Sequence, residues 1–330
     1  MGTCKTNILL TAMAFIFILP TSPLHSAELK GSEGLGNQTT LLRLSRDLVA
    51  GNKLDLKNEF VSLAVGRGVG AGQAYLQQFF STAELQVNVK DPGKPTGGLL
   101  LVLPLSDQEN TGYSVFSQGS IFRFDGRTTV NFGMGYRRLV LSNQLLLGIN
   151  AFYDHEFPYD HARTSFGLEA KTTVGALNAN LYNGRTSWKR GRAGFLEKGL
   201  NGEDLEISMP LPYVNWITAY ARTFKWKSAI GSVKSTRGSD FSLKFSPPIS
   251  DGLQVEIGRR DYKSESDTTF LTLNYNLAFS SPDIGESRKW ASKVAYTLAS
   301  MEQERFTKVR RENLIFKQKR ASGTLTITGF

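Results

Sequence analysis

Hydrophobic and polar residues alternate along two neighbouring segments near the middle of the chain. In residues 130–137 every second side chain is apolar and the others are polar or glycine. After a turn-like segment at residues 141–143, residues 145–154 again have one apolar face, and Gly148, Asn150 and Asp154 stand on the other. Because successive side chains of a strand point to opposite sides, we predict an antiparallel hairpin with one apolar face. A strand pair in a soluble sandwich has the same pattern, so the hairpin alone does not distinguish a protein core from lipid.

The same two-residue period continues along most of the chain. Further alternating segments are residues 82–90, 99–105, 113–124, 164–173, 177–182, 205–209, 215–226, 241–245, 253–258 and 268–279. Together with the hairpin they make about twelve strands of about ten residues, the length with which a tilted strand crosses a bilayer. The sequence therefore predicts an all-β protein, with a twelve-stranded antiparallel transmembrane barrel of the outer membrane over residues 82–279.

The connections between these strands differ in length at the two ends of the predicted barrel. The even-numbered connections are short, whereas the fifth, seventh and ninth, at residues 155–162, 186–202 and 227–239, are longer and polar. Short turns on one side and long loops on the other are typical of bacterial outer-membrane barrels. The third connection, Asp125-Gly126, is a short exception on the outer side.

Aromatic residues suggest where the membrane interfaces lie. Trp216 and Trp226 stand at the two ends of one predicted strand, which would separate them by roughly 25 Å in a tilted strand. We predict that they and two tyrosines, Tyr153 and Tyr275, are membrane-interface aromatics. The alternative is that the tryptophans fill a core.

The chain begins with a segment typical of exported proteins. Residues 1–27 have a basic start, a short apolar run and a small-residue exit, which predicts a signal peptide. Residues 28–81 contain helix-like periods, and we predict a helical periplasmic leader. The single cysteine, Cys4, lies in the signal segment, so the mature chain can form no internal disulfide and no thiolate metal site.

The formal net charge of +10 raises the question of a nucleic-acid partner. The basic residues are dispersed among strand-like segments and form no helix-borne stripe or nucleic-acid motif. We therefore expect no nucleic-acid partner. Cationic pore lining and contact with anionic head groups explain the charge better.

Several ordered motifs carry a family resemblance. They are Arg127–Asn131, Gly135–Arg137, Gly148–His155, Arg163 with Gly167–Glu169, Asn180–Tyr182 with Trp188, Asn201–Asp204 and Leu211-Pro212. In this order they resemble the inverse autotransporters, the β-domain of intimin and invasin, over residues 71–320. The resemblance implies a twelve-stranded outer-membrane barrel, followed by a linker that re-enters the pore and carries an extracellular passenger outward.

The C-terminal segment, residues 280–330, is similar to that linker. We predict a helix over residues 286–301 and an outward-leading extended segment over residues 306–316. About fifty residues follow Phe279, whereas one immunoglobulin-like module needs roughly 100. We therefore expect no passenger domain in this chain and no binding of a host receptor by it.

The expected partners follow from the class of protein. They are outer-membrane lipid, lipopolysaccharide, the barrel-assembly machinery and periplasmic chaperones, and the oligomeric state stays open. The family role is export or anchoring of a C-terminal surface segment, related to bacterial adhesion. A simple pore is an alternative.

One predicted loop gathers residues with possible chemistry. Residues 154–161 contain carboxylates and the histidines His155 and His161, which would suit a metal site or the acid/base pair of an outer-membrane hydrolase. No serine nucleophile motif or metal-ligand spacing accompanies them. We favour a hydrogen-bond cluster that orders the loop, and we expect no enzyme activity, catalytic residue, metal or cofactor.

A second set of residues shares the inward face of the predicted strands. It comprises Asn131, Arg137, Asn150, Glu169, Lys171, Glu256 and Arg260. These pore-lining residues either select solutes in an open pore or form mutual ion pairs that pack against the re-entering C-terminal segment. The second interpretation is favoured because opposite charges are interleaved along the strands.

Overall fold

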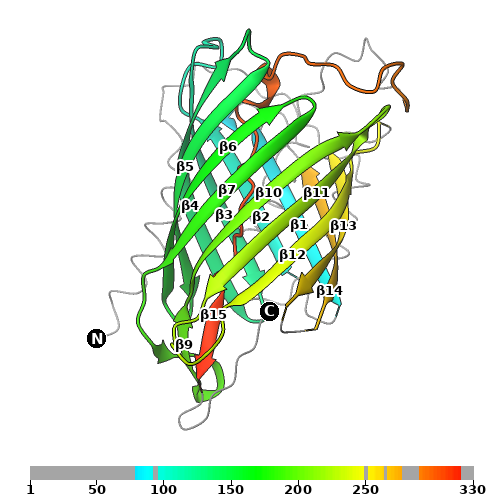
Figure 1. Ribbon diagram of the computed structural model, residues 1–330. Coiled ribbons are helices and arrows are strands. Elements are labelled where there is room, and N and C mark those ends of the chain that lie inside the picture. The colour runs from blue at the N-terminus through cyan, green and yellow to red at the C-terminus, as the bar shows by residue number, and fades with distance from the viewer. Residues whose placement is uncertain (1–78, 92–95, 249–251, 264–265, 277–289, 321–330) are drawn as a thin grey trace, which may run out of the picture.

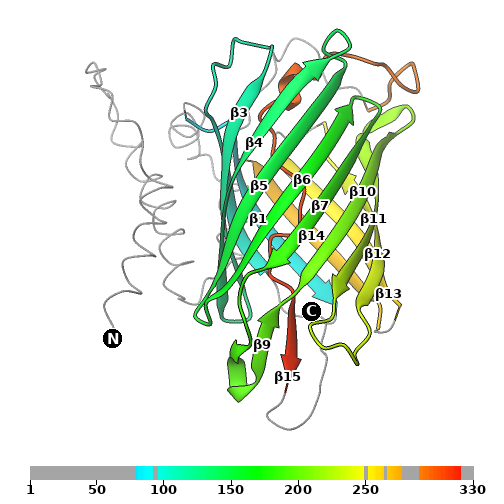
Figure 2. The same ribbon diagram turned by 60° about the vertical axis from the view of Figure 1, so that its left-hand side comes forward.

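Twelve antiparallel strands form one closed barrel (Figures 1 and 2). The computed structural model describes residues 79–91, 96–248, 252–263, 266–276 and 290–320. The barrel strands are β1 (Thr82–Asp91), β2 (Thr96–Pro104), β3 (Ser114–Phe124), β4 (Arg127–Val140), β5 (Leu145–Phe157), β6 (His161–Thr172), β7 (Gly175–Gly184), β10 (Asn201–Leu211), β11 (Val214–Lys227), β12 (Thr236–Phe245), β13 (Leu253–Tyr262) and β14 (Thr268–Asn276). The predicted all-β, twelve-stranded antiparallel barrel is confirmed.

The barrel closes between its first and last strands. Strand β1 pairs with β14 in a register that places Leu85 opposite Tyr275 and Val87 opposite Leu273. Closure leaves none of the twelve strands with an unpaired edge, which an open sheet of this size would expose. Within the described ranges no helix has the length and apolar character to cross a membrane. The predicted signal peptide lies outside the described residues, as does the predicted leader up to residue 78.

The two ends of the barrel carry different connections. At one end, here called the turn end, β6–β7 and β10–β11 are joined by only residues 173–174 and 212–213. At the opposite end, the loop end, residues 185–200 join β7 to β10 and contain two short strands, β8 (Lys189–Arg190) and β9 (Leu196–Gly199), with the 3-10 turn η1 (Arg192–Gly194) between them. The predicted long connection at 155–162 is wrong, because β5 and β6 extend through it and leave only residues 158–160 as a turn.

Large apolar side chains cover the outside of the barrel. They include Phe132, Met134, Tyr136, Leu147, Ile149, Tyr153, Phe166, Leu168, Leu177, Leu181, Leu205, Ile207, Met209, Phe241, Leu243, Ile257 and Leu271, all of them exposed. The inward side chains between them are largely polar or charged and buried. This distribution is the reverse of that in a soluble sandwich, where apolar side chains face inward and polar ones outward.

Inward glycines let aromatic rings lie flat against the wall. A Cβ atom on Gly135 would come within 2.2 Å of the Phe116 ring, and one on Gly133 within 2.3 Å of the Phe152 ring. The ring comes from the neighbouring strand in each case. The glycines therefore widen the interior at the positions where a bulky side chain crosses the strand beside it.

The described C-terminal segment runs from one end of the barrel to the other. Residues 290–305 follow the turn end and contain the short 3-10 turn η2 (Glu302–Glu304). Residues 306–316, here called the threaded segment, pass through the interior, and β15 (Lys317–Arg320) pairs with β9 at the loop end. In Figure 1 this path is drawn in orange over the upper end of the barrel, continues inside the barrel and ends in the red strand β15 beside β9. The helix predicted over residues 286–301 is not formed in residues 290–301, and residues 286–289 lie outside the described residues.

Candidate functional site: the filled barrel interior

All seven predicted pore-lining residues are buried on the inner face of the wall. Asn131, Arg137, Asn150, Glu169, Lys171, Glu256 and Arg260 each expose less than a tenth of their surface. They belong to β4, β5, β6 and β13. The structure brings only some of them together: Arg137, Glu169 and Lys171 form one group, whereas Glu256 and Arg260 interact with different partners.

Arg137 connects the wall to the start of the threaded segment. Its Nε donates to Glu169 Oε1 at 2.6 Å, and Lys171 Nζ lies 2.9 Å from the other carboxylate oxygen. Its Nη1 donates to the carbonyl oxygens of Arg305 and Thr307 at 2.9 and 2.7 Å. It also lies 3.3 Å from the carbonyl oxygen of Glu304. The guanidinium thus binds backbone carbonyl groups of a segment that pairs with none of the described strands at this height.

An apolar cluster surrounds the point where the threaded segment enters. It consists of Leu100, Val102, Phe116 and Phe152 from the wall, with Phe306 and Val309 from the threaded segment. The backbone N–H of Val309 donates to Gln118 Oε1 at 2.8 Å. Contact on several sides therefore fixes both the side chains and the backbone of this part of the segment.

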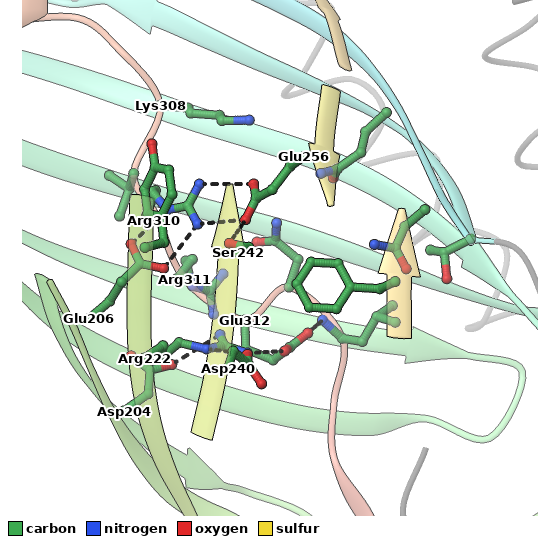
Figure 3. A pocket seen from close by; sticks show the side chains of 18 of the residues that line it. Asp204, Glu206, Arg222, Asp240, Ser242, Glu256, Lys308, Arg310, Arg311 and Glu312 are labelled. Atoms are coloured by element: carbon green, nitrogen blue, oxygen red, sulfur yellow. Dashed lines mark hydrogen bonds and ion pairs between the residues drawn. The ribbon is translucent and has the colours of Figure 1, made fainter. Parts of the chain in front are cut away.

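Two acidic wall residues bind Arg310 near the middle of the barrel (Figure 3). Arg310 Nε and Nη2 donate to the two carboxylate oxygens of Glu206 at 2.6 and 2.9 Å, and Glu256 lies 3.4 Å away. The guanidinium also stacks over the Tyr220 ring, 3.9 Å from its centroid. Arginine can form two parallel hydrogen bonds to one carboxylate and stack on an aromatic ring, whereas lysine cannot combine these contacts.

Arg311 points to the other side of the interior. It donates two hydrogen bonds to Asp154, at 2.8 and 2.7 Å, and neither side chain is exposed. Arg163 approaches the same carboxylate at 2.7 Å and donates to the carbonyl oxygens of Glu312 and Leu314. One carboxylate thus holds two guanidinium groups, one from the wall and one from the threaded segment.

Glu312 of the threaded segment is acidic and meets basic residues of the wall. Its carboxylate lies 3.5 Å from Arg222 and 3.9 Å from Arg260. Both of these arginines are also paired with Asp240 on the wall. Arg310 and Arg311 therefore meet acidic wall residues, whereas Glu312 meets basic ones.

A cavity of about 190 Å³ remains beside residues 310–312, and it is lined mainly by β1 and β10–β14.

Aromatic residues enclose the threaded segment near the loop end. The Phe316 ring stacks on Trp226, with centroids 4.3 Å apart and planes 10° apart, and Tyr182 packs on the same indole at 5.1 Å. Trp226 is only 2% exposed. The prediction that Trp226 lies at a membrane interface is therefore wrong: it faces inward and fills a core.

The other predicted interface aromatics occupy different positions. Tyr153 is on the outer face of β5 and exposed, and Tyr275 shares the outer face of β14 with Leu271. Trp216 is half-buried at the turn end, where its indole N–H donates to the carbonyl oxygen of Trp290 at 2.9 Å. Their role at a membrane interface stays a prediction.

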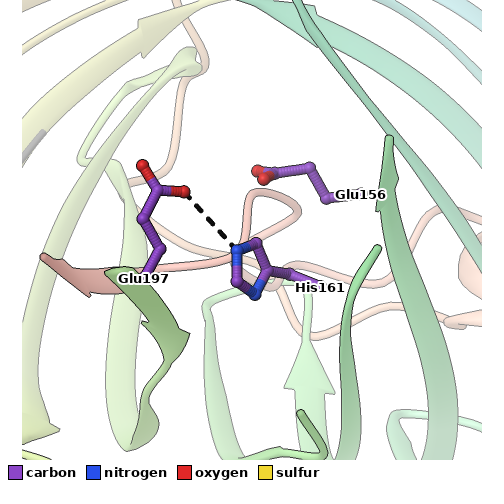
Figure 4. Close-up of side chains that lie close together, drawn as sticks. All are labelled: Glu156, His161 and Glu197. Atoms are coloured by element: carbon purple, nitrogen blue, oxygen red, sulfur yellow. Dashed lines mark ion pairs between the residues drawn. The ribbon is translucent and has the colours of Figure 1, made fainter. Parts of the chain in front are cut away.

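A compact ionic cluster, here called the exit cluster, lies where the threaded segment leaves the barrel (Figure 4). Arg127 donates to Glu197 through both nitrogens at 2.8 Å and to Glu156 at 2.7 Å. His161 Nε2 lies 3.5 Å from Glu197, and Lys317 pairs with Glu156. Burial favours the neutral form of Glu197, but the His161 and Arg127 contacts prevail and hold its pKa at about 2. Burial lowers the pKa of Lys317, which the two carboxylates partly offset.

Three residues of the exit cluster have the chemistry of metal ligands. One atom each of Glu156, His161 and Glu197 lies within 4.8 Å of the others. Arg127 and Lys317 already neutralise both carboxylates. A divalent ion would place its charge beside two cations, so the arrangement fits an ion-pair cluster better than a metal centre.

The two histidines of the hydrolase alternative do not form a pair. Glu156 and His161 are directly opposed in the β5–β6 ladder and both are buried inside. His155 is the neighbour of Glu156 and therefore faces outward, where its ring packs on Phe157 at 4.4 Å. The alternative of a shared hydrolase site of His155 and His161 is thus wrong in its geometry, and both residues lie in strands and not in a loop.

The sequence interpretation missed most of the residues that hold the threaded segment. These are Glu84, Asp154, Glu206 and Arg222 on the wall, and Lys308, Arg310, Arg311 and Glu312 on the segment. The alternation already placed Glu206 opposite Leu205, and therefore inward. What the sequence lacked was the pairing partner, more than 100 residues away along the chain.

A closed barrel with an apolar outside, a charged inside and its own C-terminal segment threaded through it defines a self-threaded β-barrel. Comparison with known families agrees. The chain belongs to the inverse autotransporter β-domain family, whose model matches residues 40–313.

Individual proteins of known name are also similar to this chain. The chain is 30% identical over 159 residues to a putative attaching and effacing protein homolog of Escherichia coli K12, covering 47% of this chain and 52% of that protein. It is 30% identical over 169 residues to invasin of Yersinia enterocolitica, covering 50% and 19%. The chain thus spans about half the length of the first relative and a smaller part of the second.

One solved structure shares the fold. It was reported in work on the mechanism of in-meso crystallization of membrane proteins, and it superposes with a TM-score of 0.57 at 19% identity. The match covers 72% of this chain and all of that one. At this identity the similarity supports the barrel fold alone.

Proposed function

We propose that this chain is an outer-membrane translocator of the intimin and invasin type, which carries its own C-terminal segment through the barrel to the outer surface. One observation supports this above all: residues 306–316 run through the interior from the turn end to the loop end, and β15 then pairs with β9 outside the barrel wall. A segment in this position joins the two sides of the barrel.

The orientation follows from the connections and the outer surface. The exposed apolar side chains around the barrel suit contact with lipid. Short turns face the periplasm in bacterial barrels, so the turn end is periplasmic and the loop end faces outward. The N-terminal leader then stays in the periplasm, and the barrel meets lipopolysaccharide in the outer leaflet. Assembly depends on periplasmic chaperones and the barrel-assembly machinery.

The biological role we propose is display for adhesion. Relatives of this chain bear the names invasin, intimin and inverse autotransporter adhesin. Whatever follows the threaded segment would be presented at the cell surface, where adhesive contacts are made. The barrel itself serves as the anchor, since its interior is occupied by the segment it carries.

Labelling of intact cells tests the topology. Because Cys4 is the only cysteine in the chain, single cysteines can be introduced at Gly231 in the loop-end β11–β12 connection and at Glu109 in the turn-end β2–β3 connection. An epitope added after Phe330 reports on the C-terminal segment. We expect a membrane-impermeant maleimide to label the Gly231→Cys variant on intact cells and the Glu109→Cys variant only after lysis.

Access of an antibody to the epitope tests whether the C-terminal segment is exported. Antibody binding to the epitope on intact cells is the expected result. If Gly231→Cys is labelled while the epitope is reached only after lysis, the barrel is inserted but does not export its C-terminal segment. The proposed function would then be wrong.

A further inference from the structure

We propose that the charges of residues 308–312 set the position at which the threaded chain stops, because the wall accepts the sequence Arg310-Arg311-Glu312 in one register only. This inference rests on the proposed function, since a stop is needed only by a chain that moves through the barrel. The residues concerned act as a recognition motif for the wall of their own barrel.

Besides Glu84, which pairs with Lys308, the wall offers three sites of defined charge to residues 310–312. The first, formed by Glu206 and Glu256, is acidic and holds Arg310. The second, Asp154, is acidic and holds Arg311. The third presents the guanidinium groups of Arg222 and Arg260 to Glu312, and both of them also pair with Asp240. Figure 3 shows the first and third sites on neighbouring parts of the wall.

The first site is built to receive a cation from outside the wall. The hydrogen bonds that the wall itself donates to these two carboxylates come from neutral groups, the Asn178 amide to Glu206 and the Ser242 hydroxyl to Glu256. Both acids are more than nine-tenths buried. Lys244 lies opposite Glu256 in the β12–β13 ladder and over the Tyr220 ring, but the cation that pairs with both carboxylates is Arg310. Without Arg310 the two buried acids would lose most of their charge compensation.

Aromatic rings make the first two sites selective for arginine. Tyr220 lies under the guanidinium of Arg310, and Phe152 lies under that of Arg311 at 4.3 Å from the ring centroid. A guanidinium stacks on a ring and forms two parallel hydrogen bonds to a carboxylate at the same time. A lysine ammonium at these positions would keep the charge but lose part of this geometry.

A slip by one residue places like charges together in either direction. If the chain retreats by one residue, Glu312 faces Asp154. If it advances by one, Arg311 faces Arg222 and Arg260, and the first site is left with Val309. Like charges in buried positions are strongly unfavourable, so both slipped positions are excluded by the same residues that stabilise the observed one.

A slip by two residues restores the alternation of side chains but not the charges. Retreat by two brings Glu312 to the acidic first site. Advance by two brings Lys308 to that site, which is acceptable, but places Arg310 against Arg222 and Arg260. The observed register is therefore the one that satisfies all three sites.

The three wall sites give a specific expectation for charge reversal at residue 310. In an Arg310→Glu variant the observed register puts the new carboxylate beside Glu206 and Glu256. Advance by two residues instead places Lys308 at the acidic first site and the new carboxylate at the basic third site. We expect the variant to leave the observed register and to favour the position advanced by two.

Cysteine cross-linking measures the register directly. Gln118 lies on the wall and contacts the backbone of Val309. The pair Gln118→Cys with Val309→Cys reports the observed register, and Gln118→Cys with Thr307→Cys reports the position advanced by two. Both pairs are placed in the full chain, which is otherwise free of cysteine once the predicted signal peptide with Cys4 is removed. Outer membranes that contain the variants are treated with a short thiol cross-linker.

The wild-type charges should give a strong 118–309 cross-link and a weak 118–307 cross-link. With Arg310→Glu we expect the 118–309 yield to fall about tenfold, equivalent to about 1.4 kcal/mol, and the 118–307 yield to rise. Arg310→Lys is the matched control and should keep the 118–309 cross-link. Adding Glu206→Arg to Arg310→Glu should restore it, which separates a change of register from a failure to fold.

The outcomes distinguish this inference from the function on which it rests. An absent 118–309 cross-link in the otherwise unaltered chain means that the segment is not threaded, and the proposed function fails with it. A strong 118–309 cross-link that Arg310→Glu leaves unchanged means that the chain is threaded but its charges do not set the register. That result overturns the inference alone.

Discussion

Asp154 on β5 and Arg311 on the threaded segment form a two-hydrogen-bond ion pair inside the barrel, at 2.8 and 2.7 Å, although 157 residues separate them in the chain. Arg163 donates to the same carboxylate from the neighbouring strand. The single carboxylate therefore balances two buried guanidinium groups. Its loss would leave both without a full counter-charge.

Replacing Asp154 with asparagine tests the importance of this pair. The side chain keeps its size but loses its charge, so we expect Asp154→Asn to lower the free energy of unfolding by about 3 kcal/mol. Urea unfolding in detergent micelles measures the change. The control is Asp261→Asn, which removes an exposed pair with Arg259 and should change the stability by less than about 1 kcal/mol. Equal losses of stability in the two variants would show that the buried ion pair contributes no more than the exposed one.

The contact between Gly135 and Phe116 gives a second prediction. A Cβ at residue 135 would lie 2.2 to 2.9 Å from three atoms of the Phe116 ring. We expect Gly135→Ala to destabilise the barrel by about 1 to 3 kcal/mol, because the ring must leave its place on the wall. Gly231→Ala is the control, since a Cβ there meets nothing within 4 Å. Adding Phe116→Leu should recover part of the loss, and no recovery would mean that the ring is not the cause.

Adjacent residues on β14 test which face meets lipid. Leu273 shares the outer face with Leu271, whereas Asn274 is 2% exposed and lines the interior cavity. We expect Leu273→Arg to cost about 2 to 4 kcal/mol in a bilayer and Asn274→Arg far less. Folding titrations with lipid vesicles measure both. Equal costs would contradict the assignment of the two faces.

The sequence was sufficient to predict the barrel because its pattern is local. Alternation along each strand assigns every side chain to one of two faces, and the number and length of the strands then favour a closed barrel. Strand ends were less well predicted. Residues 155–162 look like a polar loop, yet Glu156 and His161 continue the inward face of β5 and β6 and pair there with Arg127 and Glu197.

The site depends on contacts that no local pattern contains. Trp226 and Trp216 have the same spacing that interface aromatics would have, but a ring from the threaded segment, Phe316, covers Trp226 inside. The charged residues in 308–312 likewise pair with wall residues on β1, β5, β10, β11 and β13, and their own sequence does not reveal these partners. Long-range pairing of this kind follows from the path of the chain through the barrel.

Removing the threaded segment should change conduction. A chain ending at Ser300 keeps all twelve strands but lacks the residues that fill the interior. Glu84, Glu206 and Glu256 then lose the cations Lys308 and Arg310. In planar bilayers we expect large, cation-selective channels from this variant and little current from the full chain. Glu206→Gln with Glu256→Gln in the shortened chain should reduce the selectivity, and equal currents with and without the segment would contradict the interpretation.

The exit cluster should respond to acid through Glu197. Its pKa is held at about 2, below the ordinary 4.5. A carboxyl group whose pKa is lower in the folded protein stabilises the fold fully above its unfolded pKa and loses this contribution as the pH falls through the folded one. The stability difference between the wild-type chain and Glu197→Gln should therefore be constant from pH 6 to 8 and shrink between about pH 4.5 and 2. Urea unfolding at several pH values measures it. A difference that is the same at both ends of this range would mean that the charge of Glu197 contributes nothing, and that β9 and β15 are held by their backbone hydrogen bonds alone.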